Sequence, residues 1–326
     1  MTVNNKNQNY VVETGKRVLK SSSFNIFIVL FVMCVIMYIV SEPFRSWDNV
    51  LSIARNFSAY AITGIGVSMV IIAGGIDLSL GSVYGFAGVI ATMAMADLGW
   101  PAFPSIILGM IAGALFGLFN GLLVVKAKLP PFIATLGTLS IARSLCYILT
   151  EGYPVTDVKE RFLFLGQGYM ASIPTPIWMM VIVAIIFAVF LNQTVTGRRI
   201  YALGGNEEAT RISGINVNKV KVLVYTLCSL LAGFSGIMTA SRLGIGQPTS
   251  GQGFELDAIA AVIIGGASLD GGAGTVTGTI LGAAIMGVLR NALVLLSIKS
   301  HWQSLIIGFV IIIAVAADQL KKSRGK

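Results

Sequence analysis

Five ionisable residues lie inside or beside long apolar stretches of the sequence. They are Asp77, Arg143, Glu255, Asp257 and Arg290. A charged side chain at membrane depth usually faces a partner or a water-filled cavity, because hydrocarbon cannot solvate it. Two interpretations remain open. These residues form structural ion pairs or reach the membrane interface, or some of them line a polar pathway for a solute.

Motifs for catalysis are missing from the chain. The segment GGAGTVTG, 271–278, departs from a dinucleotide-binding fingerprint in its final spacing, and no P-loop occurs. A single histidine, His301, and three widely separated cysteines give little material for a metal site. We therefore predict a non-catalytic protein that needs neither cofactor nor metal. A series of buried carboxylates, typical of ion-driven carriers, is not evident either.

One short charged segment, GGNEEATRISGI at 204–215, stands between two apolar spans. Its pattern is typical of a short helix that begins after an N-cap asparagine, has acidic residues in its first turn and ends at Gly214. Gly204 and Gly205 are expected to form a flexible entry. A helix this short is marginal alone in water, so we predict that it docks on a partner, with a solvated loop helix as the alternative. The candidate docking residues are Asn206, Glu207, Glu208, Thr210 and Arg211.

Two glycine-containing segments resemble each other: VIIAGGIDLSLG at 70–81 and VIIGGASLDGG at 262–272. Each follows an apolar run and leads into another glycine-rich span. Paired helix breaks at matching positions of two halves are typical of transporters built from internal repeats. We predict a helix break or gate near the cytoplasmic interface at each segment. The residues concerned are Gly74, Gly75, Asp77, Gly265 and Gly266.

The elements that position these residues must be membrane-spanning helices. Hydrophobic residues make up 55% of the 326 residues and charged residues 11%, and the mean hydropathy is +0.83, whereas a soluble domain has about 25% charged residues. Apolar runs of about 20 residues recur, and in lipid such runs form helices or closed barrels. The absence of strand-like alternation favours an all-α integral membrane protein, a polytopic bundle of about ten spans. The expected spans are 24–41, 50–73, 79–97, 104–125, 131–150, 176–192, 219–241, 256–267 (short, a half-helix or re-entrant segment), 274–296 and 302–318.

Lysine and arginine are distributed unequally between the connections, and cytoplasmic loops carry the excess. This predicts a cytoplasmic segment 1–23 followed by an uncleaved first span, a transmembrane region 24–318 and a cytoplasmic tail 319–326. The connection 193–218 would then be cytoplasmic and 151–175 would lie outside. The net charge of +9 does not indicate nucleic-acid binding, because the basic residues are spread between the spans.

Glycine recurs every fourth residue in two spans. Small residues at this spacing line one helix face and allow close backbone approach, so we expect both series to serve helix packing. They are Gly109, Gly113, Gly117 and Gly121, and Gly274, Gly278 and Gly282.

Four blocks carry a resemblance to a known family. YALGGNEEATRISGINVNKVK (201–221), GIDLSLGS (75–82), FIATLGT (132–138) and ELDAIAAVIIGGASLDGG (255–272) together resemble the ribose-type sugar permeases of bacterial ATP-binding-cassette (ABC) importers. The resemblance extends over nearly the whole chain, and the first and last blocks are specific.

The resemblance implies a multi-pass permease of the bacterial inner membrane that forms a homodimer or a heterodimer with a related permease. A separate cytoplasmic ATPase would supply the energy, and a periplasmic binding protein would deliver a sugar, either ribose or a similar pentose or monosaccharide. Segment 204–215 corresponds to the family's coupling helix, which seats in a cleft of the ATPase. The alternative is an ion-coupled secondary carrier for a small polar solute. The coupling segment relates to the ATPase, so the sugar remains open.

Overall fold

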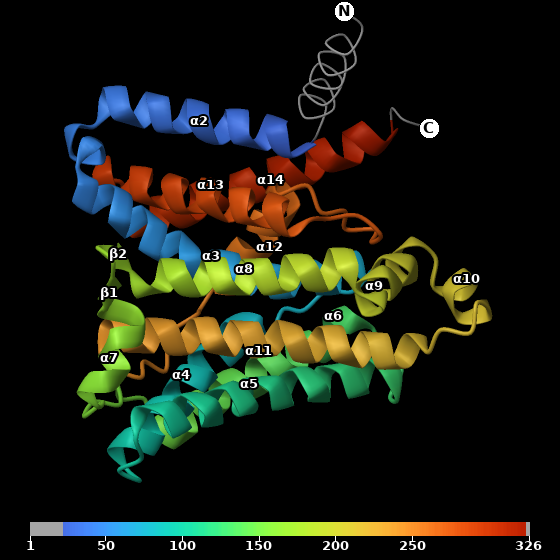
Figure 1. The fold of residues 1–326 in the computed structure, drawn as a ribbon, viewed down its shortest axis with the longest axis horizontal. Helices are drawn as coiled ribbons and strands as arrows, with labels where there is room; N and C mark the ends of the chain where they lie inside the picture. The colour runs from blue at the N-terminus through green and yellow to red at the C-terminus, as the bar shows by residue number, and fades with distance from the viewer. Residues whose placement is uncertain (1–21, 324–326) are drawn as a thin grey trace, which may run out of the picture.

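The computed structural model describes residues 22–323, so the expectations for 1–21 and 324–326 lie outside the described residues. Helices dominate the chain (Figure 1). The elements are α2 (Ser22–Val40), η1 (Glu42–Arg45), α3 (Trp47–Ile72), α4 (Leu80–Ala96), α5 (Ala102–Val125), α6 (Pro131–Thr150), α7 (Glu160–Gln167), β1 (Tyr169–Met170), β2 (Ile173–Pro174), α8 (Thr175–Gln193), α9 (Val195–Gly205), α10 (Glu207–Ile212), α11 (Val217–Leu243), α12 (Phe254–Ile264), α13 (Val276–Leu295) and α14 (Ser300–Ser323).

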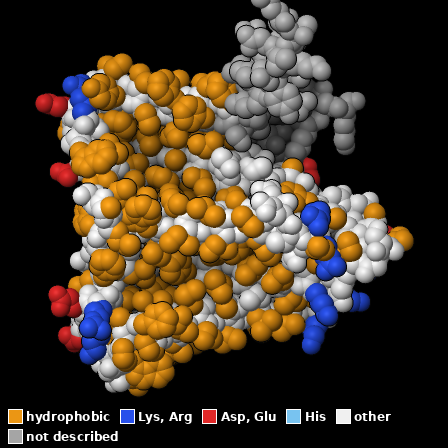
Figure 2. All heavy atoms as spheres, in the orientation of Figure 1, with side chains coloured by type: hydrophobic (Ala, Val, Ile, Leu, Met, Phe, Trp, Pro, Cys, Tyr) orange, Lys and Arg blue, Asp and Glu red, His pale blue; other side chains and the backbone are white. Residues whose placement is uncertain are grey.

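The long helices confirm an all-α polytopic membrane protein. Six helices are long and apolar enough to cross a membrane, namely α3, α5, α6, α8, α11 and α13, and three shorter apolar helices lie in α2, α4 and α14. Together with α12 they correspond one by one to the ten predicted spans. Figure 2 shows a wide hydrophobic surface between two ends that carry the charged side chains.

The two ends of the bundle differ in structure. At one end, called here the α7 end, lie α7 and the antiparallel pair β1–β2, in which Tyr169 is paired with Pro174 (Figure 1). At the opposite end, the α10 end, lie α9 and α10. The predicted connection 193–218 therefore contains two helices, one more than expected.

Helix α11 forms the centre of the bundle and packs against α5, α4 and α3. Its contact with α5 depends on the first glycine series. A Cβ on Gly113 would lie 3.0 Å from the Ser229 carbonyl oxygen, and one on Gly121 would lie 2.7 Å from the Val222 Cα. The second series acts in the same way between α13 and α12, where a Cβ on Gly278 would collide with the Gly265 carbonyl oxygen. The first series, and Gly278 and Gly282 of the second, form packing faces as predicted. Gly274 precedes the start of α13, and a Cβ there would meet Ile72 and Ala267 instead.

The two glycine-containing segments end their helices with the same hydrogen bonds. Gly74 N–H donates to the Ile71 carbonyl at 2.9 Å, and Gly266 N–H donates to the Ile263 carbonyl at 2.8 Å. Gly74 and Gly266 have φ angles of +79° and +85°, a conformation that glycine adopts at the C-terminus of a helix. Equivalent positions of the two sequences thus have equivalent backbone structure, in line with the predicted repeat.

Helix α12 is too short to cross a bilayer. Its 11 residues span about 16 Å at 1.5 Å per residue, roughly half of a 30 Å hydrocarbon layer. The chain enters from the α7 end as the non-helical segment 244–253 and becomes helical at Phe254. The segment 73–79 enters from the α10 end and becomes helical at Leu80. The first turns of α4 and α12 therefore meet inside the bundle.

Candidate functional site

Helix α10 has the N-terminus that the sequence predicts. Asn206 is the N-cap, and its Oδ1 accepts a hydrogen bond of 2.9 Å from the backbone N–H of Ala209. The Thr210 hydroxyl donates 2.7 Å to the Asn206 carbonyl, and Thr210 is buried. Gly214, with φ +80°, follows the end of the helix. The local sequence is thus sufficient to define this short helix.

Glu207 connects α10 to α11. One carboxylate oxygen lies 3.0 Å from Nη2 of Arg211, and the other lies 2.7 Å from Nζ of Lys221. The hydrogen bond from Lys221 is the main cause of the lowered pKa of Glu207, and the charge of Lys221 and then the hydrogen bond and charge of Arg211 lower it further. Glu207 therefore fixes the position of α10 within the chain. The outward surface of α10 is formed instead by Glu208 and Ile212, whose side chain is 78% exposed.

Gly204 lies at the point where α9 meets both helix breaks. It is part of helix α9, which corrects the expectation of a flexible entry at Gly204 and Gly205. A Cβ on Gly204 would lie 2.5 Å from the Gly272 amide nitrogen and would collide with the Ile72 carbonyl oxygen. Gly272 N–H itself donates 2.8 Å to that carbonyl. Ile72 ends α3 and Gly272 follows α12, so the base of α10 contacts both breaks.

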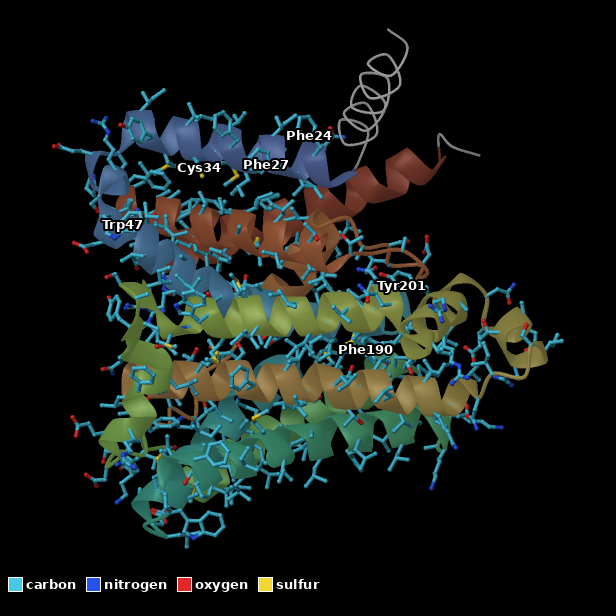
Figure 3. The ribbon with its side chains drawn as sticks, viewed as in Figure 1. Phe24, Phe27, Cys34, Trp47, Phe190 and Tyr201 are labelled. Atoms are coloured by element: carbon cyan, nitrogen blue, oxygen red, sulfur yellow. The ribbon has the colours of Figure 1, made fainter. Side chains whose placement is uncertain are left out.

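A hydrogen bond from α9 and a small cavity beside α10 also connect these two helices with the breaks. The Tyr201 hydroxyl donates 2.8 Å to the Gly274 carbonyl, and Tyr201 lies at the α10 end of the molecule (Figure 3). A small cavity of about 50 Å³ is lined by Gly74, Gly75, Glu207 and Tyr225, among others.

The glycines of the breaks are tightly packed. The Tyr225 hydroxyl leaves no room for a Cβ on Gly75, which would lie 2.6 Å away. Gly265 is equally confined, since its Cβ would lie 2.5 Å from the Gly278 carbonyl oxygen.

Asp77 lies deeper in the bundle than the predicted interfacial position. It is 1% exposed, and its Oδ1 accepts hydrogen bonds from the Ser79 amide at 2.9 Å and the Ser79 hydroxyl at 2.6 Å. Asn120 Nδ2 donates 2.8 Å to that same hydroxyl. Ser229, which faces the carboxylate, is about 18 Å along α11 from Val217. Three buried oxygens here have no partner, namely Asp77 Oδ2, Asn120 Oδ1 and Ser229 Oγ.

Arg143 holds the crossing point of the two non-helical segments. Its guanidinium group donates to the carbonyls of Pro248 at 2.6 Å, Ser250 at 2.8 Å and Gly81 at 3.3 Å. These carbonyls belong to the entry segment of α12 and to the first turn of α4. The Glu255 carboxylate lies against Gly81, where a Cβ would collide with it. Arg143 and Glu255 therefore lie together at the start of α4 and α12.

Asp257 and Arg290 form an ion pair between α12 and α13. The Asp257 side chain is almost fully buried, while that of Arg290 is 37% exposed. Of the five predicted ionisable residues, this pair matches the structural interpretation most directly. The structure thus brings Arg143 and Glu255 together at one point, Asp257 and Arg290 at a second, and Asp77 at a third.

A family model described as "Branched-chain amino acid transport system / permease component" matches residues 49–315. The ribose import permease protein RbsC of Haemophilus influenzae is 43% identical over 317 residues, covering 96% of this chain and 97% of the relative. RbsC of Escherichia coli K12 is 42% identical over 299 residues, covering 90% and 93%. RbsC of Bacillus subtilis is 42% identical over 299 residues, covering 91% and 92%. No solved structure matches the chain.

The chain belongs to this permease family. The comparisons confirm the resemblance to ribose-type permeases of ABC importers. They also confirm the prediction of a non-catalytic transport subunit, because the family consists of permease components. The family description mentions branched-chain amino acids, whereas the relatives named above are ribose permeases, so the family match alone does not define the cargo.

Several residues of the site were not predicted from the sequence. Lys221, Asn120 and Ser229 are polar residues in apolar spans, which is the only signal that the sequence offers. Their partners are far away in the chain: Glu207 and Lys221 are 14 residues apart, and Ser79 and Asn120 are 41 apart. Such pairs depend on how the helices pack.

Proposed function

We propose that this chain is the membrane-spanning subunit of an ABC importer that carries ribose or a closely related pentose. A separate ATPase would bind at the α10 end, and a binding protein would deliver the sugar at the α7 end. The identity of 42–43% to ribose import permeases over most of the chain supports the substrate class. The observation that carries the proposal is α10, a short helix with an exposed apolar tip whose base contacts both helix breaks.

The proposed orientation places the α10 end in the cytoplasm. Seven basic residues lie in or beside the connections at this end, namely Lys126, Lys128, Arg198, Arg199, Arg211, Lys219 and Lys221, against Arg45, Lys159, Arg161, Arg242 and Lys299 at the α7 end. This asymmetry favours a cytoplasmic α10 end. The first described turn of α2 and the last of α14 also lie toward the α10 end (Figure 1), in line with cytoplasmic termini in the bacterial inner membrane.

The ATPase is proposed to bind the exposed surface of α10. Ile212 is a large, exposed apolar side chain at the end of the short, charged helix α10, and an exposed apolar residue of this kind is suited to fill a pocket of a partner. Glu208 and Arg211 lie beside it and would meet complementary charges. The internal ion pairs of Glu207 would keep α10 in a fixed orientation, which lowers the entropy lost on docking.

Movement of the ATPase would reach the membrane through Gly204. Since α9 contacts the end of α3 and the loop after α12 at this residue, a displacement of α10 would displace both breaks together. The breaks at Gly74, Gly75, Gly265 and Gly266 would then act as the gate. Asp77 would anchor the first break to α5 through Ser79 and Asn120.

A second permease copy is proposed to pack on α6. Its exposed face carries Gly137, Ser140 and Ser144 among apolar residues, and small residues are common where membrane helices associate. Arg143 is on the same helix, so the crossing point with Glu255 would lie near the interface. We propose that Arg143 and Glu255, together with Asp257 and Arg290, border the sugar pathway.

Reconstitution in proteoliposomes tests the proposed function. Uptake of radiolabelled ribose should require this chain, the ATPase, the binding protein and ATP. The rival carrier would instead drive uptake by an ion gradient with this chain alone. Stoichiometric recovery of an ATPase with the tagged chain supports the importer. Ribose uptake that depends on a sodium or proton gradient, without ATP, contradicts it.

A further inference from the structure

A polar groove lies between α3 and α13, in the half of α3 that begins at Trp47 at the α7 end (Figure 3). It has a volume of about 270 Å³ and is lined by Ser52, Asn56 and Tyr60 from α3 and by Arg290 and Asn291 from α13. Ser52, Asn56 and Tyr60 follow one another at intervals of four residues and so share one face of α3. On α13 the intervals of three and four residues from Gly287 to Arg290 and Asn291, and on to Val294, place the lining on one side of the helix. An amide pair between Asn49 and Asn291, with hydrogen bonds of 2.7 and 3.3 Å, joins the two helices beside the groove.

The one charged residue that lines the groove, Arg290, is paired, and Arg242, which has no acidic partner among the described residues, does not line the groove. Arg290 is neutralised by Asp257, and the Asn56 side-chain oxygen accepts a hydrogen bond from Arg242. The Ser52 side-chain hydroxyl forms no hydrogen bond with the described residues. The groove therefore offers hydroxyl and amide groups without an unpaired charge, which favours a neutral ligand rich in hydroxyl groups over an anion or a cation.

The groove also adjoins the shortened helix α12. Tyr60 stacks on Phe254, the first residue of α12, with ring centroids 4.9 Å apart, and Arg290 pairs with Asp257 in the first turn. In membrane transporters, solutes commonly bind where interrupted helices begin near the middle of the bilayer. An aromatic ring beside hydroxyl and amide groups matches the mixed apolar and polar faces of a sugar.

The size of the groove limits the ligand. Its volume equals the share of about nine water molecules at roughly 30 Å³ each, and it lies slightly below the roughly 300–1,000 Å³ of drug-sized pockets. A monosaccharide fits this space, whereas a disaccharide or a lipid headgroup with its glycerol would not be enclosed.

We propose that this groove is a binding site for a neutral monosaccharide within a single permease subunit, occupied on the way from the α7 end. The proposal rests on the proposed function, since it assumes that the chain carries a sugar. It adds a site on α3 and α13 that is separate from the crossing point held by Arg143.

Protection of an introduced cysteine from a thiol reagent tests whether a sugar binds in the groove. Ser52→Cys is nearly isosteric and is made in a background that lacks Cys34, Cys146 and Cys228, with Val50→Cys as the control. Val50 is exposed on the same helix and does not line the groove. Ribose should slow the reaction of the cysteine at position 52 with a small water-soluble thiol reagent by about tenfold, and should not change the reaction at position 50. An unchanged rate at position 52 in saturating ribose, L-arabinose and D-xylose, each tested alone, overturns the proposal.

Filling the groove provides a second measurement. Ser52→Phe should lower ATP-driven ribose uptake by about tenfold, while membrane abundance and ATPase recovery stay normal, and Val50→Phe should transport normally. If Ser52→Phe reaches the membrane at normal levels and transports ribose like the unmodified chain, the groove is not a sugar site. That outcome would leave the importer assignment intact, because the same assay with the unmodified chain tests ATP-driven uptake separately.

Discussion

At the scale of single residues, Asp77 is a buried carboxylic acid with an unsatisfied oxygen. Within residues 22–323 it pairs with no basic side chain, and its Oδ2 is buried without a partner. An unpaired ionised carboxylate in such a place costs several kcal/mol. A neutral side chain with a donor at this position would satisfy Asn120 Oδ1, which also lacks a partner.

We therefore expect Asp77→Asn to retain membrane abundance and most of the ribose uptake. Asp77→Leu should lose both, because it leaves the Ser79 hydroxyl and amide unsatisfied at about 1–3 kcal/mol each. Immunoblots of membranes and initial uptake rates measure the two effects. Equal losses in both variants would show that the carboxylate charge itself is required.

Glu207 gives a pH prediction at the same scale. Its pKa is lowered in the folded chain from an ordinary value of 4.5 by Lys221 and Arg211. The ion pairs therefore stabilise α10 at pH values above the ordinary pKa, and this contribution is lost as the pH falls through the folded pKa. A fluorescent probe on Ile212→Cys, in a background without native cysteines, should gain mobility only below pH 4.5.

Glu207→Gln supplies the control for that measurement. The amide cannot form the ion pairs with Lys221 and Arg211, so the probe should be mobile at neutral pH and change little on acidification. If the probe shows the same mobility above and below pH 4.5 when Glu207 is retained, Glu207 does not hold α10 against α11.

Sequence reasoning at the residue scale succeeded where the interaction is local. Asn206, Thr210 and Gly214 define α10 through contacts within a few residues, and the sequence pattern predicts them. The pairing of Glu207 with Lys221 could not be predicted, since it depends on the turn between α10 and α11. The two glutamates looked equivalent in sequence, yet Glu207 is paired internally and Glu208 is exposed.

At the scale of elements, the contact of α9 with the breaks permits a matched pair of substitutions. Gly204→Ala places a methyl group against the Ile72 carbonyl and the Gly272 amide, whereas Gly205→Ala meets no atom within 4 Å. Overpacking of this kind costs about 1–3 kcal/mol and would shift α9 away from both breaks. We expect Gly204→Ala to reduce ribose transport per ATP hydrolysed while the complex still assembles.

Gly205→Ala should behave like the unmodified chain in the same assay. Coupling is measured as the ratio of ribose taken up to phosphate released in proteoliposomes. Normal coupling in Gly204→Ala at normal abundance would remove the argument that this contact transmits movement.

The positions of the two helix breaks in the sequence could be predicted, whereas their depth within the bundle could not. The glycines that follow the sequence Val-Ile-Ile in both segments mark the C-terminal ends of α3 and α12 correctly, because the end of a helix is determined by nearby residues. The path of the chain beyond each break is decided by distant partners, such as the hydrogen bond from Arg143 to Pro248 across 105 residues. For this reason the meeting of α4 and α12, and the buried position of Asp77, became visible only in the structure.

At the scale of the whole molecule, the class of protein was predictable because bilayer thickness and backbone hydrogen bonding leave few alternatives. The ten predicted spans each match an apolar helix, including the short α12. Relative helix positions could not be predicted, since lysine and arginine counts give only the side of the membrane. The groove between α3 and α13 is a product of those positions.

The central claim is that α10 is the docking element of a separate ATPase, and recovery of that ATPase with the tagged permease tests it most directly. The comparison uses Ile212→Asp and, as a control, Val195→Asp, an exposed apolar residue in α9 at the start of the same connection. A charge at a desolvated contact weakens association by several kcal/mol. Since each tenfold change in affinity corresponds to about 1.4 kcal/mol, we predict that Ile212→Asp reaches the membrane normally but recovers at most about a tenth of the normal amount of ATPase, while Val195→Asp recovers a normal amount. Normal ATPase recovery with Ile212→Asp would contradict the claim.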